Sequence, residues 1–379
     1  MSKCFSSPDR GAHRSRIFTS ESVTEGHPDK VADAIADAVL DAYLRVDPEA
    51  RVACEVLCKG GMVVLGGEVD AVDAEGSVDH VAVVREAVRR IGYEGVGGAF
   101  GADQVVVVDA IGKQSTALAS SLTRTGDLAA GDQGLVFGYA TDETPELMPL
   151  PILAAHRITA GLAQARKSGA HPWLGPDGKS QVSVRYEGDR PVGIATVVVS
   201  AQHRAGMAVE EVQRLLHEEL VPAALGELYS AEIEVIANPA GEFVLGGPEA
   251  DCGVTGRKII VDTYGGMARH GGGAFSGKDA TKVDRSAAYF ARFVARAIVL
   301  RGLAARAELQ ICYAIGQAQP VALHVDTFGT GDAAAAEEFA RTFDYRPAAI
   351  IERLGLRRPV YSETTHYGHF GKPQLPWEA

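Results

Sequence analysis

The apolar and polar positions of this chain follow an order of elements that occurs three times. Apolar residues at helical spacing predict a helix over residues 29–46, and alternation predicts strands over 51–58 and 62–69 on either side of a glycine turn. A second helical stripe covers residues 78–91. One unit therefore consists of a helix, a two-stranded hairpin and another helix.

The same order returns twice towards the C-terminus. The second copy has a helix at 151–167 that begins at a favourable proline, strands at 181–186 and 192–200, and a helix at 208–225. The third copy has a helix at 284–301, strands at 308–315 and 321–328, and a helix at 332–343. The pattern predicts an α+β fold of three related units in a pseudo-threefold arrangement, with helices outside the sheets. Hairpins make these sheets antiparallel or mixed, unlike a parallel Rossmann sheet.

The repeat divides the chain into expected domains. Residues 1–16 are basic without an apolar run, which is typical of a disordered tail rather than a secretion signal. Residues 116–131 are polar, small and poorly periodic, which predicts a flexible active-site loop. The three α+β units are then residues 17–115, 132–246 and 247–379.

Charge and cysteine usage narrow the classes of partner. The net charge of −12 disfavours nucleic acid and anionic membranes, and no apolar run reaches the roughly 18 residues of a membrane span. Five scattered cysteines argue against a disulfide framework or a zinc site and fit a reducing cytoplasm, with Cys54 and Cys58 expected as buried thiols. Residues 257–301 hold nine Lys or Arg against three Asp, a local charge of +6 that predicts a small anionic ligand.

This basic segment contains a glycine-rich run after a predicted strand at 257–263. Gly272 to Lys278 has the spacing of a P-loop, but Asp279 stands where a P-loop needs Ser or Thr, and the strand ends too early. A true P-loop is excluded, although glycine backbone and lysine still suit a phosphate site. A plain flexible loop is the alternative, which Lys278 and Lys282 weaken.

Acidic residues near the first helix have structural explanations of their own. Asp29 lies where the helix dipole favours an anion, and His27 is just outside the helix end. A row of three acids repeats every four residues and is expected on a solvated face rather than at a metal site: Asp33, Asp37 and Asp41.

Three further acids have two interpretations each. Glu55 and Glu68 interrupt apolar strands, so each either points to solvent or needs a partner, and Asp251 lies in a turn-rich loop where Asp is common. The sequence has no Gly-x-Ser-x-Gly elbow, no His-Glu-x-x-His motif and no plausible Cys/His metal cluster.

Several long motifs resemble those of the methionine adenosyltransferases, also called S-adenosylmethionine synthetases. They are FTSESVTEGHPDK at 18–30, GDQG at 131–134, FGYAT at 137–141, GRKIIVDTYGG at 256–266, HGGGAFSGKD at 270–279 and KVDRS at 282–286. The resemblance runs from about residue 18 to the C-terminus. It implies a three-unit α+β enzyme that makes S-adenosylmethionine from ATP and L-methionine, as a homodimer with shared active sites that is often paired into a homotetramer.

The resemblance also implies roles at matching positions. The triphosphate would be surrounded by His27, Arg257, Lys258, Lys278 and Lys282. The rest of ATP would meet Asp177, Lys179, Phe243 near adenine, Asp251 between the substrates and the backbone of Ala274. Methionine would be bound by Glu68, Gln114, Asp132, Asp251 and Lys282. Two Mg²⁺ ions per site would be held through Asp29 and Asp284, and K⁺ through Glu55. The catalytic set would be His27, Lys179, Arg257, Lys278 and Lys282.

The implied reaction needs no general base, because a thioether sulfur is already nucleophilic. Its attack on ribose C5′ expels triphosphate, so the barrier depends on alignment and on stabilising negative charge. In the family the bound triphosphate is then cleaved to pyrophosphate and phosphate.

The chain departs from the family pattern at a few positions. Ala129 replaces a usual glycine, Glu242 stands where arginine is common, and the loop before Ala129 is shorter. Two other functions stay open from the residues alone. One is a generic ATP phosphotransferase or NTPase, which would turn over ATP without methionine. The other is a non-catalytic nucleotide-binding regulatory subunit, which the retained phosphate-site residues disfavour.

Overall fold

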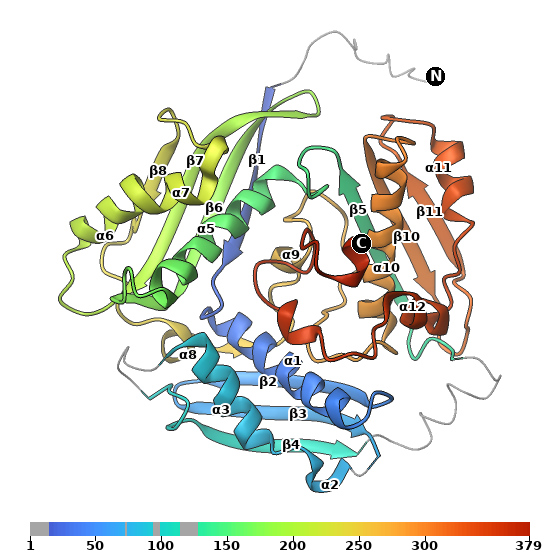
Figure 1. Ribbon diagram of the computed structural model, residues 1–379, viewed down its shortest axis with the longest axis horizontal. Helices are drawn as coiled ribbons and strands as arrows, with labels where there is room; N and C mark the ends of the chain where they lie inside the picture. Colours follow the sequence, from blue (N-terminus) through green and yellow to red (C-terminus); the bar gives the residue numbers. More distant parts are fainter. Residues whose placement is uncertain (1–14, 73, 94–98, 114–127) are drawn as a thin grey trace, which may run out of the picture.

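The computed structural model describes residues 15–72, 74–93, 99–113 and 128–379, and these form three sheets with helices packed on one face of each (Figure 1). Residues 1–14 of the predicted tail and 116–127 of the predicted loop lie outside this part of the chain. Residues 15 and 16 already belong to the first strand. In the described part, no helix is long and apolar enough to cross a membrane.

The predicted α+β architecture is confirmed, with three antiparallel hairpins at the expected positions. The hairpins are β2 (Arg51–Lys59) with β3 (Met62–Asp70), β6 (Leu174–Glu187) with β7 (Arg190–His203), and β10 (Arg306–Tyr313) with β11 (Ala322–Asp326). A long helix precedes each hairpin, in order α1 (Pro28–Val46), α5 (Leu150–Lys167) and α10 (Val283–Leu300). Each helix buries its apolar stripe against a sheet, which is why helical and alternating periodicities recur together.

Shorter helices complete the helical layer. They are α2 (Ala74–Ser77), α3 (His80–Ile91), α6 (Val209–Leu215), α7 (Val221–Leu225), α8 (Gly247–Ala250), α11 (Ala333–Ala340) and α12 (Pro347–Leu354). The predicted helix at 208–225 is present but contains a π-helical turn at Leu216–Leu220. Cys54 and Cys58 are buried, as predicted.

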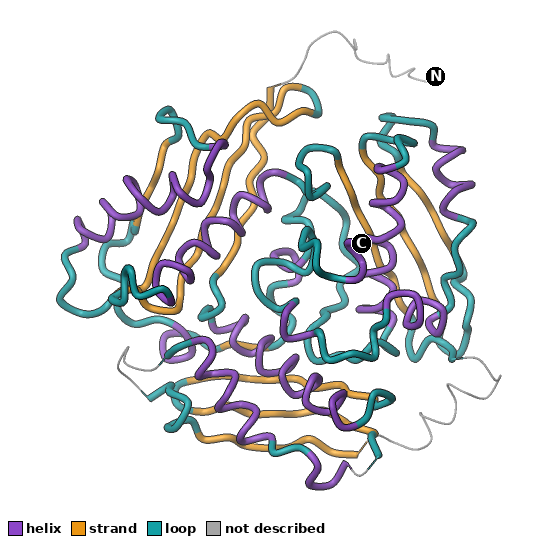
Figure 2. The backbone as a smooth tube through the Cα atoms, in the orientation of Figure 1, coloured by secondary structure: helices purple, strands orange, loops and turns teal. Residues whose placement is uncertain are grey.

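Each sheet takes one strand from a distant part of the chain. The first strand, β1 (Ser15–Val23), pairs with β6, and β5 (Gly134–Thr141) pairs with β10. The short β9 (Gly253–Val254) pairs with β2, and the sheets are completed by β4 (Val106–Lys113) beside β3 and β8 (Glu234–Ala237) beside β7. These exchanges tie the units together, and loops meet at the centre of the molecule (Figure 2).

The strand predicted at 257–263 is wrong, because the segment forms the single helical turn α9 (Ile259–Asp262). A short apolar run does not distinguish a strand from a buried helical turn by periodicity. Glycines at 256, 265 and 266 have positive φ and end the turn on both sides. Asp262 is buried and accepts a 2.6 Å hydrogen bond from Lys30, which holds the turn against α1.

The solvated face predicted for the acids of α1 is also wrong, since Asp33, Asp37 and Asp41 are all buried. Loops from the C-terminal third of the chain cover this side of α1. Asp37 pairs with Arg285 through both carboxylate oxygens, at 2.7 and 2.9 Å, and both side chains are inaccessible to solvent. A regular spacing of acids fixes one helix face but does not reveal what packs on that face.

Candidate active site

The N-terminus of α1 collects the first group of predicted site residues. His27 is the N-cap, and its Nδ1 accepts a hydrogen bond from Asp29 N at 3.2 Å. Asp29 in turn accepts 2.6 Å and 3.0 Å hydrogen bonds from Lys258 Nζ and Val254 N, with Arg257 3.7 Å away. The strand β9 and the following loop therefore bring two cations of the basic segment to Asp29, the residue at the helix N-terminus that the resemblance placed in the site.

Charge at this point favours an anionic ligand. Burial, followed by the positive charges of Lys258 and Lys179, lowers the pKa of His27 to about 4. Asp29 has a lowered pKa, because hydrogen bonds from Lys258 and Val254 outweigh the effect of burial. Asp29 thus faces Arg257, Lys258 and a neutral imidazole, and the excess positive charge suits phosphate oxygens.

The ends of β6 and β7 hold the residues expected around the rest of the nucleotide. Lys179 is exposed and forms a 2.7 Å ion pair with Glu21 of β1. Burial and the neighbouring Asp251 raise the pKa of Asp177 to about 6, while hydrogen bonds from Gly247 and Gly178 oppose the shift. Asp177 and Asp251 therefore lie near each other, as their shared assignment to the nucleotide requires.

Phe243 is held by a strap that the sequence did not indicate. His203 N donates to Phe243 O at 2.9 Å, and Phe243 N donates to His203 Nε2 at 3.1 Å. Next to it, Gln202 Nε2 donates to Val244 O at 3.0 Å. His203 and Gln202, which hold the segment 243–244, are buried at the end of β7. A polar residue at the end of a strand is common, so the sequence alone does not indicate such a role. The exposed Glu242 lies outside this set of contacts.

The glycine-rich loop and α10 form the second group. Lys278 Nζ lies 2.7 Å from Asp284, and Lys282 pairs with Asp279. Burial raises the pKa of Glu55, and the nearby Lys278 ammonium opposes that shift. The loop runs against β2, where Ala53 and Lys278 form an isolated bridge. This places Lys278 and Asp284 together with Glu55, three residues that the sequence assigned to one site.

The buried acids of α1 align the two groups. Asp33 accepts from Gly256 N at 2.9 Å, next to Arg257 and Lys258, and Asp37 accepts from Gly277 N at 2.8 Å, next to Lys278. The loops also touch directly, because Gly256 has φ of +78° and a Cβ there would lie 2.6 Å from the Cβ of Ala274. One helix face therefore positions both cationic loops.

The residues predicted for methionine are not gathered in the same way. Glu68 lies with Glu55 on the face of the β4–β3–β2–β9 sheet that carries no helix, and neither side chain has a hydrogen bond among the described residues. Asp132 is exposed, and its Oδ1 accepts from Gln133 N at 2.7 Å. Gln114 lies outside the described residues.

The carboxylates fit magnesium only in the form that the sequence predicted. The described residues contain no cluster of three or more His, Cys, Asp or Glu side chains that would hold a metal by themselves. Asp29 and Asp284 instead stand singly, each beside a lysine of the cationic groups. Mg²⁺ commonly takes one or two carboxylates and completes its octahedron with phosphate oxygens and water, so this donor set suits a metal that enters with a polyphosphate.

Fold and site together define an α+β protein in which two cationic loops meet beside the N-terminal half of α1. Family models agree along nearly the whole chain: the S-adenosylmethionine synthetase N-terminal domain matches residues 15–116, the central domain 127–243 and the C-terminal domain 245–379. The S-adenosylmethionine synthases of two strains of Thermus thermophilus are each 53% identical over 380 residues, covering 96% of this chain and 95% of theirs.

The chain belongs to the S-adenosylmethionine synthetase family. Its activity is that of a methionine adenosyltransferase, and the comparisons do not favour the phosphotransferase or regulatory-subunit alternatives. Enzymes of this family use metal ions.

Proposed function

We propose that the two cationic groups hold the triphosphate of ATP while the sulfur of methionine attacks ribose C5′. The observation that carries this proposal is the convergence of His27, Arg257 and Lys258 on the N-terminus of α1, where the Asp29 carboxylate faces two positive charges. Attack at C5′ places a full leaving-group charge on the triphosphate. Fixed cations that already surround it lower the barrier without reorganising during the reaction.

Each residue then has a role in binding or in charge stabilisation. His27, with Nδ1 accepting from Asp29 N, presents Nε2–H to a phosphate oxygen. Lys278 and Lys282 exchange their carboxylate partners for phosphate oxygens, which frees Asp284. Asp29 and Asp284 would hold the two Mg²⁺ ions and Glu55 a K⁺ ion. Bound metal neutralises charge on the triphosphate, both when it leaves and when it is hydrolysed to pyrophosphate and phosphate.

The nucleoside and methionine ends use the remaining residues. Phe243 would stack on adenine at the end of its strap, Asp177 and Lys179 would contact the nucleotide, and Ala274 would offer its backbone. Asp251 lies near Asp177 and suits the space between the substrates. Methionine would be held by Glu68, Gln114, Asp132 and Lys282.

A second copy of the chain would complete the site. The open face of the first sheet carries an apolar patch of Leu57, Met62, Val106 and Val108, each between 37% and 62% exposed. Glu55 and Glu68 lie on the same face of the same strands. Covering this face with a partner subunit removes apolar surface from water and encloses both carboxylates. We therefore infer a homodimer with shared active sites, which pairs further into a homotetramer in the cytoplasm.

The decisive assay incubates the purified chain with ATP, methionine, Mg²⁺ and K⁺ and resolves the products by mass. S-adenosylmethionine, pyrophosphate and phosphate are expected, in a reaction that depends on methionine. Turnover of ATP without methionine would instead support a phosphotransferase.

The Lys278→Ala variant tests the phosphate group itself. Loss of the ammonium is expected to reduce kcat by about 10²- to 10³-fold, the range found when one fixed charge donor is removed. Arg341→Ala is the control, since Arg341 is an exposed cation on α11 that pairs with Glu337, away from both the site and the open sheet face. If Lys278→Ala also lowered the melting temperature strongly, the loss of rate would reflect unfolding, and Lys278 would have a structural role.

A further inference from the structure

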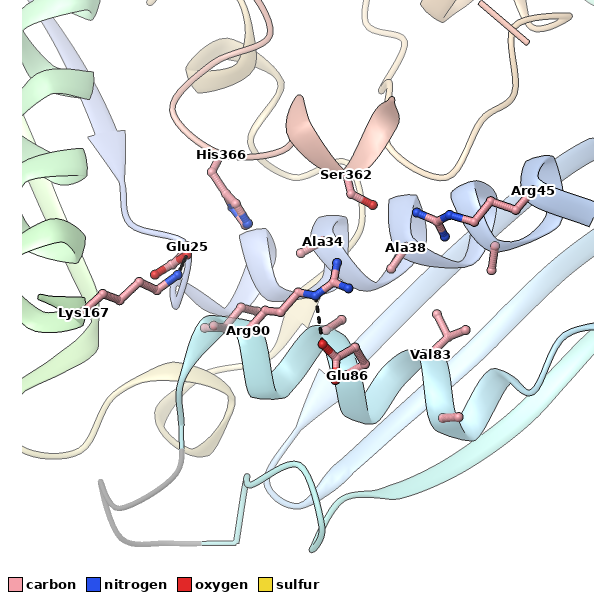
Figure 3. A pocket seen from close by; sticks show the side chains of 14 residues that line it. Glu25, Ala34, Ala38, Arg45, Val83, Glu86, Arg90, Lys167, Ser362 and His366 are labelled. Atoms are coloured by element: carbon pink, nitrogen blue, oxygen red, sulfur yellow. Dashed lines mark hydrogen bonds and ion pairs between the residues drawn. The ribbon is translucent and has the colours of Figure 1, made fainter. Parts of the chain in front are cut away.

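A groove between α1 and α3, away from the residues assigned to the substrates, has the features of a small-molecule site (Figure 3). Its volume is about 450 Å³, which is within the range of ligand pockets. The loop that contains Ser362 and His366 closes one side. None of the residues that line the groove has been given a role in the reaction.

The floor of the groove is apolar and flat, because small residues of two helices face each other. Ala34, Ala38 and Ala42 follow one another at every fourth position of α1, beside the face that holds the active-site loops. Ala82 and Ala87 of α3 lie opposite. Side chains this short leave room for the body of a ligand, and that body would remove their surface from water.

The rim of the groove carries excess positive charge. Glu25 is bound at 2.7 and 2.6 Å by Arg166 and Lys167, and Glu86 is bound by two arginines of α3. Each of these two carboxylates is therefore paired with two cationic side chains. Arg45, at the end of α1, has no ion pair among the described residues and extends over the groove in Figure 3.

A polar group is also available at the opposite end. The ring of His366 points into the groove towards α1, near Ala34 (Figure 3), and it forms no side-chain hydrogen bond with another described residue. A hydrogen bond between a ligand and the accessible part of this ring would add to the free energy of binding. Arg45 follows Ala34 by eleven positions in α1, so the two ends are about 16 Å apart along the helix.

We propose that this groove binds a small amphipathic anion. Its apolar body lies on the alanines of α1 and α3, its carboxylate, sulfonate or phosphate meets Arg45, and a polar group at its other end reaches His366. The site is separate from the cationic loops that bind ATP and does not depend on the roles assigned there.

The test uses 8-anilinonaphthalene-1-sulfonate, which combines an aromatic body with a sulfonate and becomes fluorescent in apolar sites. It is titrated into the full chain with saturating inorganic tripolyphosphate, which occupies the catalytic cations. Arg45→Glu should weaken saturable binding by about tenfold or more, because a charge-assisted contact becomes repulsive. Ala38→Trp, which fills the groove, should abolish the same binding.

Arg214→Glu is the matched control, since Arg214 is also an exposed arginine in the last turn of a helix. It should bind the probe as the parent does. Decanoate, an aliphatic carboxylate, should displace the probe from the parent, and circular dichroism establishes that each variant is folded. The proposal is overturned if the parent shows no saturable binding, if Arg45→Glu binds as the parent does, or if Arg214→Glu loses as much affinity.

Discussion

At the scale of single residues, His27 shows how surroundings decide the chemistry of a side chain. In the sequence it is a histidine before a helix. In the fold it caps that helix, and burial beside Lys258 lowers its pKa from 6.5 to about 4. The imidazole is therefore neutral at pH 7, with Nδ1 occupied by Asp29 N and Nε2–H left for a ligand.

Binding of inorganic tripolyphosphate should raise the pKa of His27 by about one unit or more, because nearby negative charge favours the imidazolium. An NMR pH titration of the ring, with and without tripolyphosphate, measures the shift. His217, an exposed histidine of the central unit, is the internal reference and should not move. An unchanged His27 titration would place the phosphates elsewhere.

The same lowered pKa affects stability in a defined pH window. The unfolded chain binds this proton near pH 6.5 and the folded chain only near pH 4, so His27 reduces the free energy of unfolding as pH falls between these values. Above pH 6.5 the two states are equally deprotonated and the effect is absent. Between pH 6.5 and 4, the free energy of unfolding of His27→Asn, measured by chemical denaturation, should fall less than that of the parent.

His203 is a positioning residue for Phe243, and its replacement separates binding from chemistry. His203→Ala removes the acceptor of the Phe243 N–H. The loss of one buried hydrogen bond should raise the KM for ATP by about tenfold, with a smaller change in kcat. The kinetics of His217→Ala serve as the control. Equal loss of kcat and thermal stability would show that the strap supports the fold rather than the nucleotide.

At the scale of elements, α1 uses two faces for two purposes. Asp33 and Asp37 hold the two cationic loops, while Ala34 and Ala38, one position further on, form the groove floor. This division explains why the helix is buried nearly all round despite its four aspartates. Each buried acid has a donor or a cation as partner, as buried charges require.

Asp37→Asn should lower the free energy of unfolding by about 3–5 kcal/mol, because it leaves the buried Arg285 without its counter-charge. Urea unfolding measures the change. Glu337→Gln, which removes an exposed pair with Arg341 on α11, should change stability by less than about 1 kcal/mol. Similar losses in the two variants would contradict the buried pair as a source of stability.

At the scale of the whole molecule, the sheets are both the frame and the surface for assembly. Helices cover one face of each sheet, and the open face of the first sheet is apolar next to the carboxylates of the site. A single chain leaves Glu55 and Glu68 on that open face. In the proposed dimer, a second subunit would cover this face and complete the site.

Replacing both Val106 and Val108 by lysine should convert the dimer to a monomer and abolish synthesis, because charge on this face opposes burial. Analytical ultracentrifugation and the product assay measure the two effects. Val81→Lys, in the first turn of α3 on the opposite side of the same sheet, should leave assembly unchanged. A fully active monomer would contradict shared sites.

The sequence by itself determined the local elements and the chemical classes. Period and hairpin signals are local, so the three hairpins and their preceding helices were predictable. The motifs from His27 to Asp29 and from Lys278 to Asp284 were recognisable through their resemblance to those of the methionine adenosyltransferases, because the residues alone also fitted a helix terminus and a flexible loop.

Only the tertiary structure decided which distant residues meet. Whether Asp37 faces water or Arg285 depends on packing between residues 248 positions apart, and whether 259–262 is a strand or a helical turn depends on Lys30. Strand exchange between units and the strap on Phe243 have the same origin. The physical reason is that long-range packing selects among local alternatives of similar free energy, and no local pattern records that selection.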